Sequence, residues 1–349
     1  MPNDLDGRTA AGSPRIVFMG TPEFAVASLD AIVNAGYDVV GVVTAPDKPA
    51  GRGMQMNESA VKKYAVARGL FLLQPEKLRD PGFLASLRDL QADLQIVVAF
   101  RMLPEMVWNM PPMGTVNLHG SLLPQYRGAA PINWAVINGE SITGVTTFRL
   151  QQEIDTGSIL LQESFPISDT DTAGDVHDLM KEIGAQVLVR TIQGLVAGTL
   201  VGVPQQNPAD LKHAPKIFTE TCRIDWARST VEIYNLIRGL SPFPAAFTFL
   251  DGKLLKIFRS GKEPASGAGV SAASASGATA ASTTGAATAS TTGAAADSTT
   301  GAVGHYDTDG KTYLRFATAD GWIRVTELQL EGKKKMGVEE FLRGYRFLC

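Results

Sequence analysis

The residues best suited to chemistry in this chain are an asparagine and a histidine separated by one position. Asn117 and His119 occur in NLHGSLLP, at the end of the apolar run Gly114–Gly120, which predicts a strand. Because side chains alternate along a strand, both residues should face the same side. An amide and an imidazole in one crevice could stabilise an oxyanion and move a proton, although a buried structural pair explains the pattern equally well.

A carboxylate follows in the motif EIDTG, which places Asp155 in a turn just before a predicted strand. Asp-Thr-Gly alone is weak evidence, because turns favour these residues for local reasons. The irregular loop SLLPQYRGAAPINW after His119 is more informative, since loops at strand ends often carry function. The chain has four histidines, and the other three lie in a predicted linker, beside a low-complexity stretch and in a predicted surface helix (His213, His305 and His177).

Two further glycine-containing segments need an interpretation. MGTPEF follows the first predicted strand but lacks the GxGxxG spacing of a dinucleotide site, so we expect no nicotinamide cofactor. The basic loop Ala45–Met56 contains Lys48 and Arg52, and it could be a solvated connection or an arm around nucleic-acid phosphates. The sequence has no P-loop, metal-binding cluster or Ser/His/Asp motif, so we expect no metal.

The elements that must position these residues alternate between strand and helix, which predicts an α/β fold with an open, mostly parallel sheet. In such sheets ligands bind beyond the carboxyl ends of the strands, where Asn117 and His119 lie. The predicted strands are Arg15–Gly20, Tyr37–Ala45, Gly69–Leu73, Asp93–Phe100, Gly114–Gly120, Gly144–Gln151 and Ser158–Ile167. The predicted helices are Phe24–Gly36, Gly82–Leu90, Pro131–Asn138 and Ala173–Ala197.

Composition shifts divide the chain into domains. Residues 1–14 form a polar leader without the apolar segment of a signal peptide, and 15–200 form the α/β domain. A segment rich in Gly and Pro, 201–218, is the expected linker to a small β-barrel or sandwich over 219–349. Within it, residues 265–303 are almost entirely Ala, Ser, Thr and Gly, which predicts a disordered loop expansion rather than a functional tether.

The bulk composition excludes several classes of protein. Hydrophobic residues make up 44% of the chain, which supports a sizeable core, and no apolar run is long enough to cross a bilayer. Cys222 and Cys349 are the only cysteines, so no disulfide framework is expected and the cytoplasm is the expected compartment. The net charge is −3, with a small excess of basic residues after Gln205, which is compatible with a polyanionic partner.

The motif VNLHGSLLPQYRGAAPINWAV, followed by GVTTF and EIDTG, resembles the core of the 10-formyltetrahydrofolate-dependent formyltransferase superfamily. The resemblance runs from about Arg15 to the C-terminus, apart from 265–303, and the block NxHxSLLPxxRGxxP is highly specific. It implies a Rossmann-like catalytic domain and an OB-like β-barrel at the C-terminus. MGTPEFAV, PDKPAGRG and RIDW favour members that act on an aminoacyl-tRNA.

The resemblance implies that the formyl group of 10-formyltetrahydrofolate passes to the α-amine of methionine on initiator tRNA. Asn117 and His119 would donate to the oxyanion, and Asp155 would favour the imidazolium and help to relay a proton. Lys48 and Arg52 would contact the tRNA, and we expect a monomer. The folate pocket would be lined by the two loops that follow neighbouring strands (Phe100, Arg101, Met102, Leu103, Ser121, Leu122, Leu123 and Pro124).

One segment departs from the family pattern. Many members have a tyrosine-glycine stretch where this chain reads AFRMLP (Ala99–Pro104), which resembles the folate-facing loop of glycinamide transformylase. Three alternatives stay open at this point: an amino-sugar formyltransferase, a formyltetrahydrofolate hydrolase, and a non-catalytic tRNA-binding protein with the same fold. They differ in the group that would accept the formyl group. The acceptor would be a sugar amine in the first alternative and water in the second, and the third would transfer no formyl group.

Overall fold

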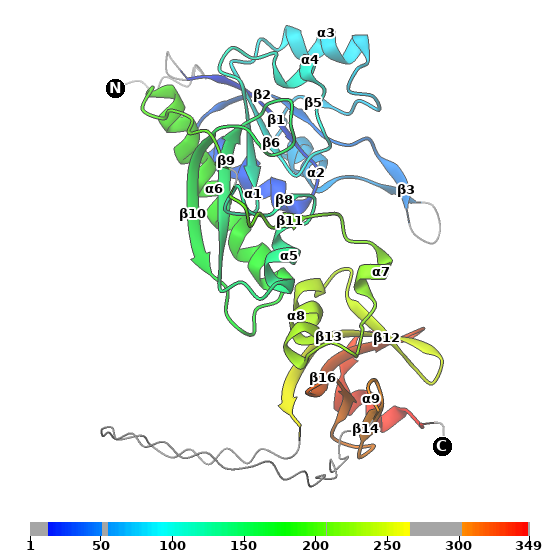
Figure 1. The fold of residues 1–349 in the computed structure, drawn as a ribbon. Coiled ribbons are helices and arrows are strands. Elements are labelled where there is room, and N and C mark those ends of the chain that lie inside the picture. Colours follow the sequence, from blue (N-terminus) through cyan, green and yellow to red (C-terminus); the bar gives the residue numbers. More distant parts are fainter. Residues whose placement is uncertain (1–12, 51–54, 207, 266–301, 348–349) are drawn as a thin grey trace, which may run out of the picture. The chain divides into compact units, whose positions relative to one another are not determined.

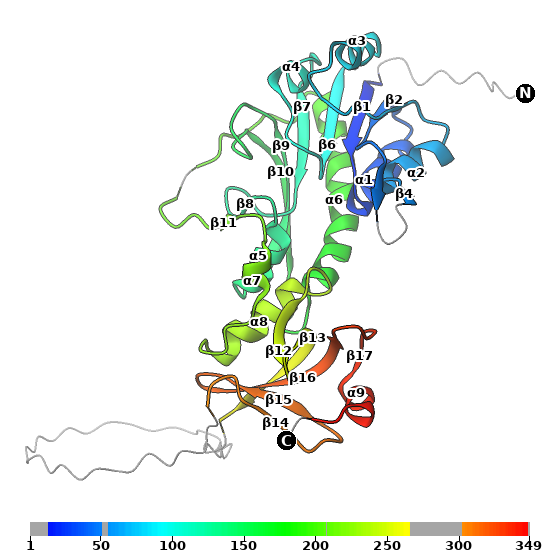
Figure 2. The same cartoon turned by 90° about the vertical axis from the view of Figure 1, so that its right-hand side faces the viewer.

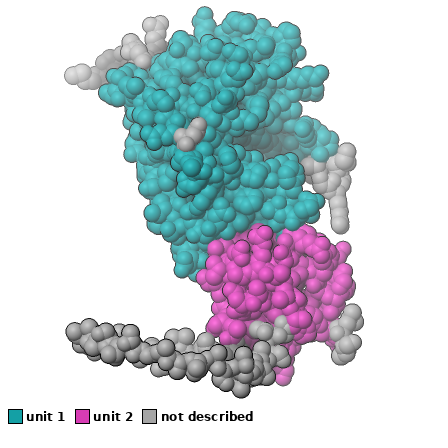
Figure 3. Space-filling model, in the orientation of Figure 1, with its two compact units in different colours: residues 1–222, 238–244 teal, residues 223–237, 245–349 magenta. Residues whose placement is uncertain are grey.

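The computed structural model describes residues 13–50, 55–206, 208–265 and 302–347 (Figure 1). The chain divides into two compact units, coloured separately in Figure 3. Unit 1 comprises Met1–Cys222 and Arg238–Pro244, and unit 2 comprises Arg223–Ile237 and Ala245–Cys349. Most of the expected leader and nearly all of the low-complexity insertion lie outside the described residues.

The central sheet of unit 1 has the strand order β10-β9-β7-β6-β1-β2-β5. Five neighbouring strands are parallel, whereas β9 is antiparallel to β7 and β10 is antiparallel to β9. The predicted α/β class with a mostly parallel sheet is therefore confirmed. The strands are β1 Arg15–Gly20, β2 Asp38–Val43, β5 Leu72–Leu73, β6 Leu94–Val98, β7 Thr115–His119, β9 Ile142–Arg149 and β10 Ile159–Pro166.

Helices cover both faces of this sheet (Figures 1 and 2). The N-terminal helix α1 packs against α6, a long helix that opens with a Thr172–Asp175 capping box. The shorter helices α2 and α5 pack into the same core cluster as α1 and α6, whereas α3 and α4 pack into the cluster on the opposite face. The helices are α1 Glu23–Asn34, α2 Ala60–Ala67, α3 Pro81–Asp89, α4 Glu105–Trp108, α5 Pro131–Ile137 and α6 Ala173–Val196.

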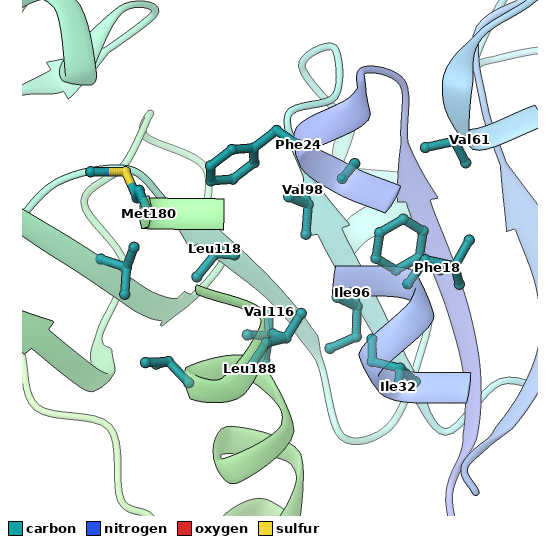
Figure 4. Close-up of a cluster of buried hydrophobic side chains, with 14 of the residues drawn as sticks. Phe18, Phe24, Ile32, Val61, Ile96, Val98, Val116, Leu118, Met180 and Leu188 are labelled. Atoms are coloured by element: carbon teal, nitrogen blue, oxygen red, sulfur yellow. The ribbon is translucent and has the colours of Figure 1, made fainter. Parts of the chain in front are cut away.

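Alternation along the strands divides the core into two clusters. On β1, Phe18 joins the cluster that includes Leu188 of α6, drawn in Figure 4. Met19, which points the other way, packs with Phe83 of α3. The same alternation operates on β7, because Val116 and Leu118 belong to the α6 cluster. The residues between and after them must therefore face the opposite side.

The sheet has a topological switch at β1, which pairs with β2 on one side and β6 on the other. After β1 the chain first builds strands on the β2 side and then moves to the β6 side. Loops that leave β1 and β6 therefore diverge and open a crevice at the carboxyl ends of the strands. This crevice is the place where the fold can bind a ligand.

Unit 2 is built on an antiparallel sheet with the order β12-β13-β16-β15-β14, and β17 pairs with β16. The helix α8, whose last residues Arg238–Leu240 belong to unit 1, precedes the sheet, and α9 follows it. The elements are α8 Thr230–Leu240, β12 Ala246–Leu250, β13 Lys253–Pro264, β14 Tyr306–Thr308, β15 Leu314–Ala317, β16 Gly321–Leu330, β17 Met336–Gly337 and α9 Val338–Gly344.

The segment expected to be a plain linker lies within unit 1 and pairs with other parts of that unit at two places. Its strand β11, His213–Ala214, runs parallel to β8, Arg127–Gly128. Val203 forms an isolated antiparallel bridge with Ile159. The remaining short elements are the hairpin β3 Lys48–Ala50 and β4 Gln55–Asn57, and the helical turn α7 Thr219–Cys222.

Candidate active site

A cavity of about 740 Å³ opens at the carboxyl ends of β1, β6 and β7. Pro22 and Phe24 contribute from the loop and helix after β1, and Ala99–Leu103 from the loop after β6. Asn117–Gly120 contribute from the end of β7. The cavity therefore occupies the crevice that the topological switch creates.

Asn117 and His119 both line this cavity. The intervening Leu118 belongs mainly to the opposite core, so the two polar residues share one face of β7, as the strand period predicts. His119 is 7% exposed, whereas Asn117 is only half-buried. The amide of Asn117 can therefore reach a ligand in the cavity.

Asp155 lies beside His119, although the two residues are far apart in the sequence. Its Oδ2 atom lies 3.9 Å from Nδ1 of His119 and accepts a hydrogen bond of 3.0 Å from the backbone amide of Gly128. The carboxylate is 9% exposed, and its residue has a left-handed backbone with φ of 55°. The structure thus brings the three predicted catalytic residues together at one wall of the cavity.

The second nitrogen of His119 decides which proton the ring can offer. Nε2 lies 2.9 Å from the carbonyl oxygen of Tyr126, which can only accept a hydrogen bond. Nε2 therefore carries a proton, and in the neutral ring Nδ1 is a free acceptor. This changes the expectation that the ring donates directly to an oxyanion, because only the imidazolium has an N–H at Nδ1.

The two loops expected to bind folate differ in their position relative to the cavity, and the loop after β6 lines it. Phe100, Arg101, Met102 and Leu103 line the cavity, and Met102 is 72% exposed. The Arg101 guanidinium donates to the carbonyl oxygens of Pro75 and Glu76, and burial lowers its pKa. Arg101 therefore connects the loop after β6 to the segment that contains Pro75 and Glu76.

The residues Ser121, Leu122, Leu123 and Pro124 are not among those that line the cavity. Ser121 is fully buried and donates to the carbonyl oxygen of Gln125 at 2.6 Å. The backbone amide of Leu123 donates to Thr146. Because the Ser121 hydroxyl and the Leu123 amide are already bonded within the protein, they support the path of the loop after His119. The expectation that Ser121–Pro124 help to bind folate stays a prediction.

Of the two residues expected to bind tRNA, Lys48 is not among those that line the cavity. Lys48 is exposed on the hairpin β3–β4, and Arg52 lies outside the described residues. The described part of the chain holds no group of three or more His, Cys, Asp or Glu side chains placed to bind a metal ion. Within the same residues, no helix has the length and apolarity that crossing a membrane requires.

The sequence interpretation missed several wall residues. His177, expected on a helix surface, lines the cavity, where its ring lies 5.3 Å from that of Phe24. Trp108 and Leu150–Ile154 form other parts of the wall. MGTPEF at the end of β1 was a usable signal for Phe24, whereas nothing local marks His177, since it reaches the cavity only because α6 packs against α1.

Comparisons with known proteins agree with this geometry. The model of the formyl transferase family matches residues 14–192, and that of the formyl transferase C-terminal domain matches residues 216–346. The chain is 51% identical to methionyl-tRNA formyltransferase of Parabacteroides distasonis, with 95% of this chain and 96% of that protein covered. It is 49% identical to methionyl-tRNA formyltransferase of Bacteroides fragilis, with 95% of each covered.

Two solved structures share the fold at low sequence identity. HypX from Aquifex aeolicus in complex with tetrahydrofolic acid has a TM-score of 0.59 and 17% identity; 95% of this chain aligns with 48% of HypX. This chain thus spans about half the length of HypX. WlaRD, a sugar 3N-formyl transferase, also has a TM-score of 0.59, with 18% identity and 92% and 99% of the two chains covered. The resemblance seen in NLHGSLLP and EIDTG is confirmed, and the chain belongs to the formyl transferase family.

Proposed function

We propose that this protein transfers the formyl group of 10-formyltetrahydrofolate to the α-amine of methionine on initiator tRNA, for translation initiation. The observation that carries the proposal is identity of about half the residues, over 95% of the chain, to proteins named methionyl-tRNA formyltransferase. The cavity supports it, because it places an amide, an imidazole and a carboxylate at one wall.

The acceptor chemistry follows from the orientation of His119. The amine attacks the formyl carbon, a C–N bond forms, and the formyl oxygen becomes an oxyanion. Nδ1 of the neutral ring accepts the proton that the amine loses, and Asp155 stabilises the imidazolium at 3.9 Å. The amide of Asn117 donates to the oxyanion. The imidazolium then returns its proton to the leaving nitrogen as the bond from the formyl carbon to that nitrogen breaks.

The cavity also suits a folate. Phe100, Met102, Trp108 and Leu150 provide apolar surface for a flat ring, and the side chains at the end of β7 provide polar groups. The folate supplies the activated formyl carbon when it binds. Phe100–Leu103 and Ser121–Pro124 both stay in the proposed folate site, and the first of these loops lines the cavity.

The proposal extends to the rest of the chain. Residues 15–200 would perform catalysis, 201–218 would connect to 219–349, and an OB-like barrel in the latter would help to hold the tRNA. The antiparallel sheet of unit 2 supports this assignment. Lys48 and Arg52 would contact tRNA phosphates, and the enzyme would act as a cytoplasmic monomer without a metal.

The test is a formylation assay with methionyl initiator tRNA and 10-formyltetrahydrofolate, with the formylmethionyl product identified by mass spectrometry. Parallel reactions contain a nucleotide-linked amino sugar, or no amine acceptor. We expect product only with the charged tRNA. Formylation of the sugar would indicate an amino-sugar formyltransferase, release of formate without an acceptor would indicate a hydrolase, and no reaction would indicate a non-catalytic tRNA-binding protein.

A further inference from the structure

Gln205 lies in the segment expected to be a linker. Its side chain makes four hydrogen bonds beside the turn Glu153–Gly157, which contains Asp155. Its Nε2 atom donates to the backbone carbonyl oxygens of Asp155 and Gly157, each at 2.8 Å. Its Oε1 atom accepts from Nε and Nη2 of Arg127, at 3.1 and 2.6 Å. Because a guanidinium only donates and a carbonyl only accepts, the orientation of this amide is fixed.

The turn that Gln205 holds is conformationally unusual. Asp155 is a non-glycine residue with φ of 55°, a backbone region that is sparsely populated without external support. Gly157 lies so close to the end of β9 that an added Cβ atom would be 1.7 Å from the carbonyl oxygen of Arg149. The turn thus keeps its shape through contacts with other segments, and Gln205 supplies two of them.

Gln205 is itself held by a longer segment, the described residues 203–206 and 208–214, which we call the strap. At one end, Val203 and Ile159 exchange backbone hydrogen bonds of 2.8 Å. At the other, the amide of Tyr126 donates to the carbonyl oxygen of Lys212 at 2.6 Å. Tyr126 in turn supplies the carbonyl that binds Nε2 of His119. The strap therefore contacts the supports of both His119 and Asp155.

We propose that Gln205 is a positioning residue that holds the Asp155 carboxylate against His119, so that this one residue of the strap belongs to the active site. This inference rests on the proposed formyl transfer. Gln205 contacts only the backbone of the turn, and it acts on the reaction through the position of Asp155. Its loss should lower turnover without changing substrate binding, since a misplacement of about 1 Å can cost on the order of 100-fold in rate.

Gln205→Glu is the most informative variant, because it keeps an oxygen for Arg127 but turns an oxygen toward the two backbone carbonyls. We expect kcat to fall by about 10- to 100-fold while KM for both substrates stays within about twofold. Gln205→Ala, which removes both sets of contacts, should behave in the same way. Gln206→Ala, a change at the exposed neighbouring glutamine, is the matched control and should retain normal kcat.

A double-mutant cycle separates positioning from a general structural effect. In an Asp155→Ala background, Gln205→Glu should change the single-turnover rate by less than about twofold, because the group that it positions is absent. A full loss of rate in both backgrounds would overturn the proposal. So would normal kcat in both Gln205 variants.

An additional readout does not depend on activity. The amide of Gly128 donates to the Asp155 carboxylate at 3.0 Å, so its resonance and hydrogen exchange report where that carboxylate lies. Gln205→Glu and Asp155→Ala should both shift this resonance and accelerate exchange, whereas Gln206→Ala should not. An unchanged Gly128 amide in Gln205→Glu would overturn the inference, whereas wild-type protein inactive in formylation would refute the proposed function instead.

Discussion

At the scale of single residues, the candidate site depends on what each polar group is already bonded to. Nε2 of His119 is bonded to the Tyr126 carbonyl, and Nδ1 faces Asp155 across 3.9 Å. Asn117 is half-buried in the wall of the cavity. This arrangement supports the proposal that the histidine accepts and returns a proton and that the asparagine stabilises negative charge on oxygen.

Replacing Asn117 with alanine should lower kcat by about 10²- to 10³-fold, the usual cost of one oxyanion donor. KM for both substrates should change little, because the interaction is made mainly in the transition state. Steady-state formylation kinetics would measure both parameters. Asn34→Ala, at the end of α1 and away from the cavity, is the control and should be normal; near-normal kcat in Asn117→Ala would contradict the oxyanion assignment.

Gly157 is the residue at which the turn that contains Asp155 has no room for a side chain. Gly157→Ala should lower the free energy of unfolding by about 2–3 kcal/mol, because the new Cβ would overlap the Arg149 carbonyl. Thermal unfolding followed by circular dichroism would measure the loss. Gly261→Ala on β13 is the control, since a Cβ added there would meet no atom of the described residues within 4 Å; equal melting temperatures for the two variants would contradict the tight packing of the turn.

At the scale of elements, a polar cluster joins the loop after β7 to the strap and to the end of α5. The Tyr126 hydroxyl and the Lys212 ammonium both donate to Oε1 of Glu140. Burial, and then the hydrogen bond to Glu140, raise the pKa of Tyr126. Burial acts to raise the pKa of Glu140, but the hydrogen bonds from Lys212 and Tyr126 outweigh it and lower that pKa below its ordinary value of 4.5. The cluster therefore favours an ionised Glu140.

Glu140→Gln should lower the free energy of unfolding by about 1 kcal/mol at neutral pH. Since the pKa of Glu140 is lower in the folded state, its stabilisation is present above pH 4.5 and is lost as the pH falls through the folded value. The difference between wild type and variant should thus shrink in acid. Urea unfolding across this pH range would measure it, with Glu182→Gln on the exposed side of α6 as the control. A difference that persists unchanged in acid would contradict the assignment.

At the scale of the whole molecule, unit 1 is completed by a segment that arrives after the chain has entered unit 2. Arg238 donates to the carbonyl oxygen of Asp171 at 3.1 Å, and the amide of Gly174 donates to that of Ser241 at 3.0 Å. Leu240 is fully buried. Unit 1, which holds the candidate site, is therefore not a single stretch of sequence.

A chain truncated after Cys222 should be less stable than one truncated after Pro244. The missing segment contributes these hydrogen bonds and the burial of Leu240, about 3–5 kcal/mol in total. At about 2–4 °C per kcal/mol, its melting temperature should be roughly 10 °C lower. Thermal unfolding of both chains would measure this. Equal melting temperatures would show that Arg238–Pro244 does not stabilise unit 1.

The sequence alone was sufficient for the α/β class, the order of the main elements and the family. Hydrophobic periodicity marks buried faces locally, and the block from Asn117 to Pro131 is long enough to be specific. It also predicted that Asn117 and His119 share a face, because that depends only on the two-residue period of a strand. Their catalytic roles, and that of Asp155, stay predictions for the assays above.

Tertiary structure alone decided how those residues are held. It brought Asp155 to His119, used the Tyr126 carbonyl to set the histidine tautomer, and bonded the Ser121 hydroxyl and the Leu123 amide to groups of the protein itself. It also made the expected linker a support of the site, through a glutamine 50 residues from Asp155 and 78 from Arg127. Hydrogen bonds across such separations leave no periodic signal in a sequence, since they form only once the sheet has brought the loops together.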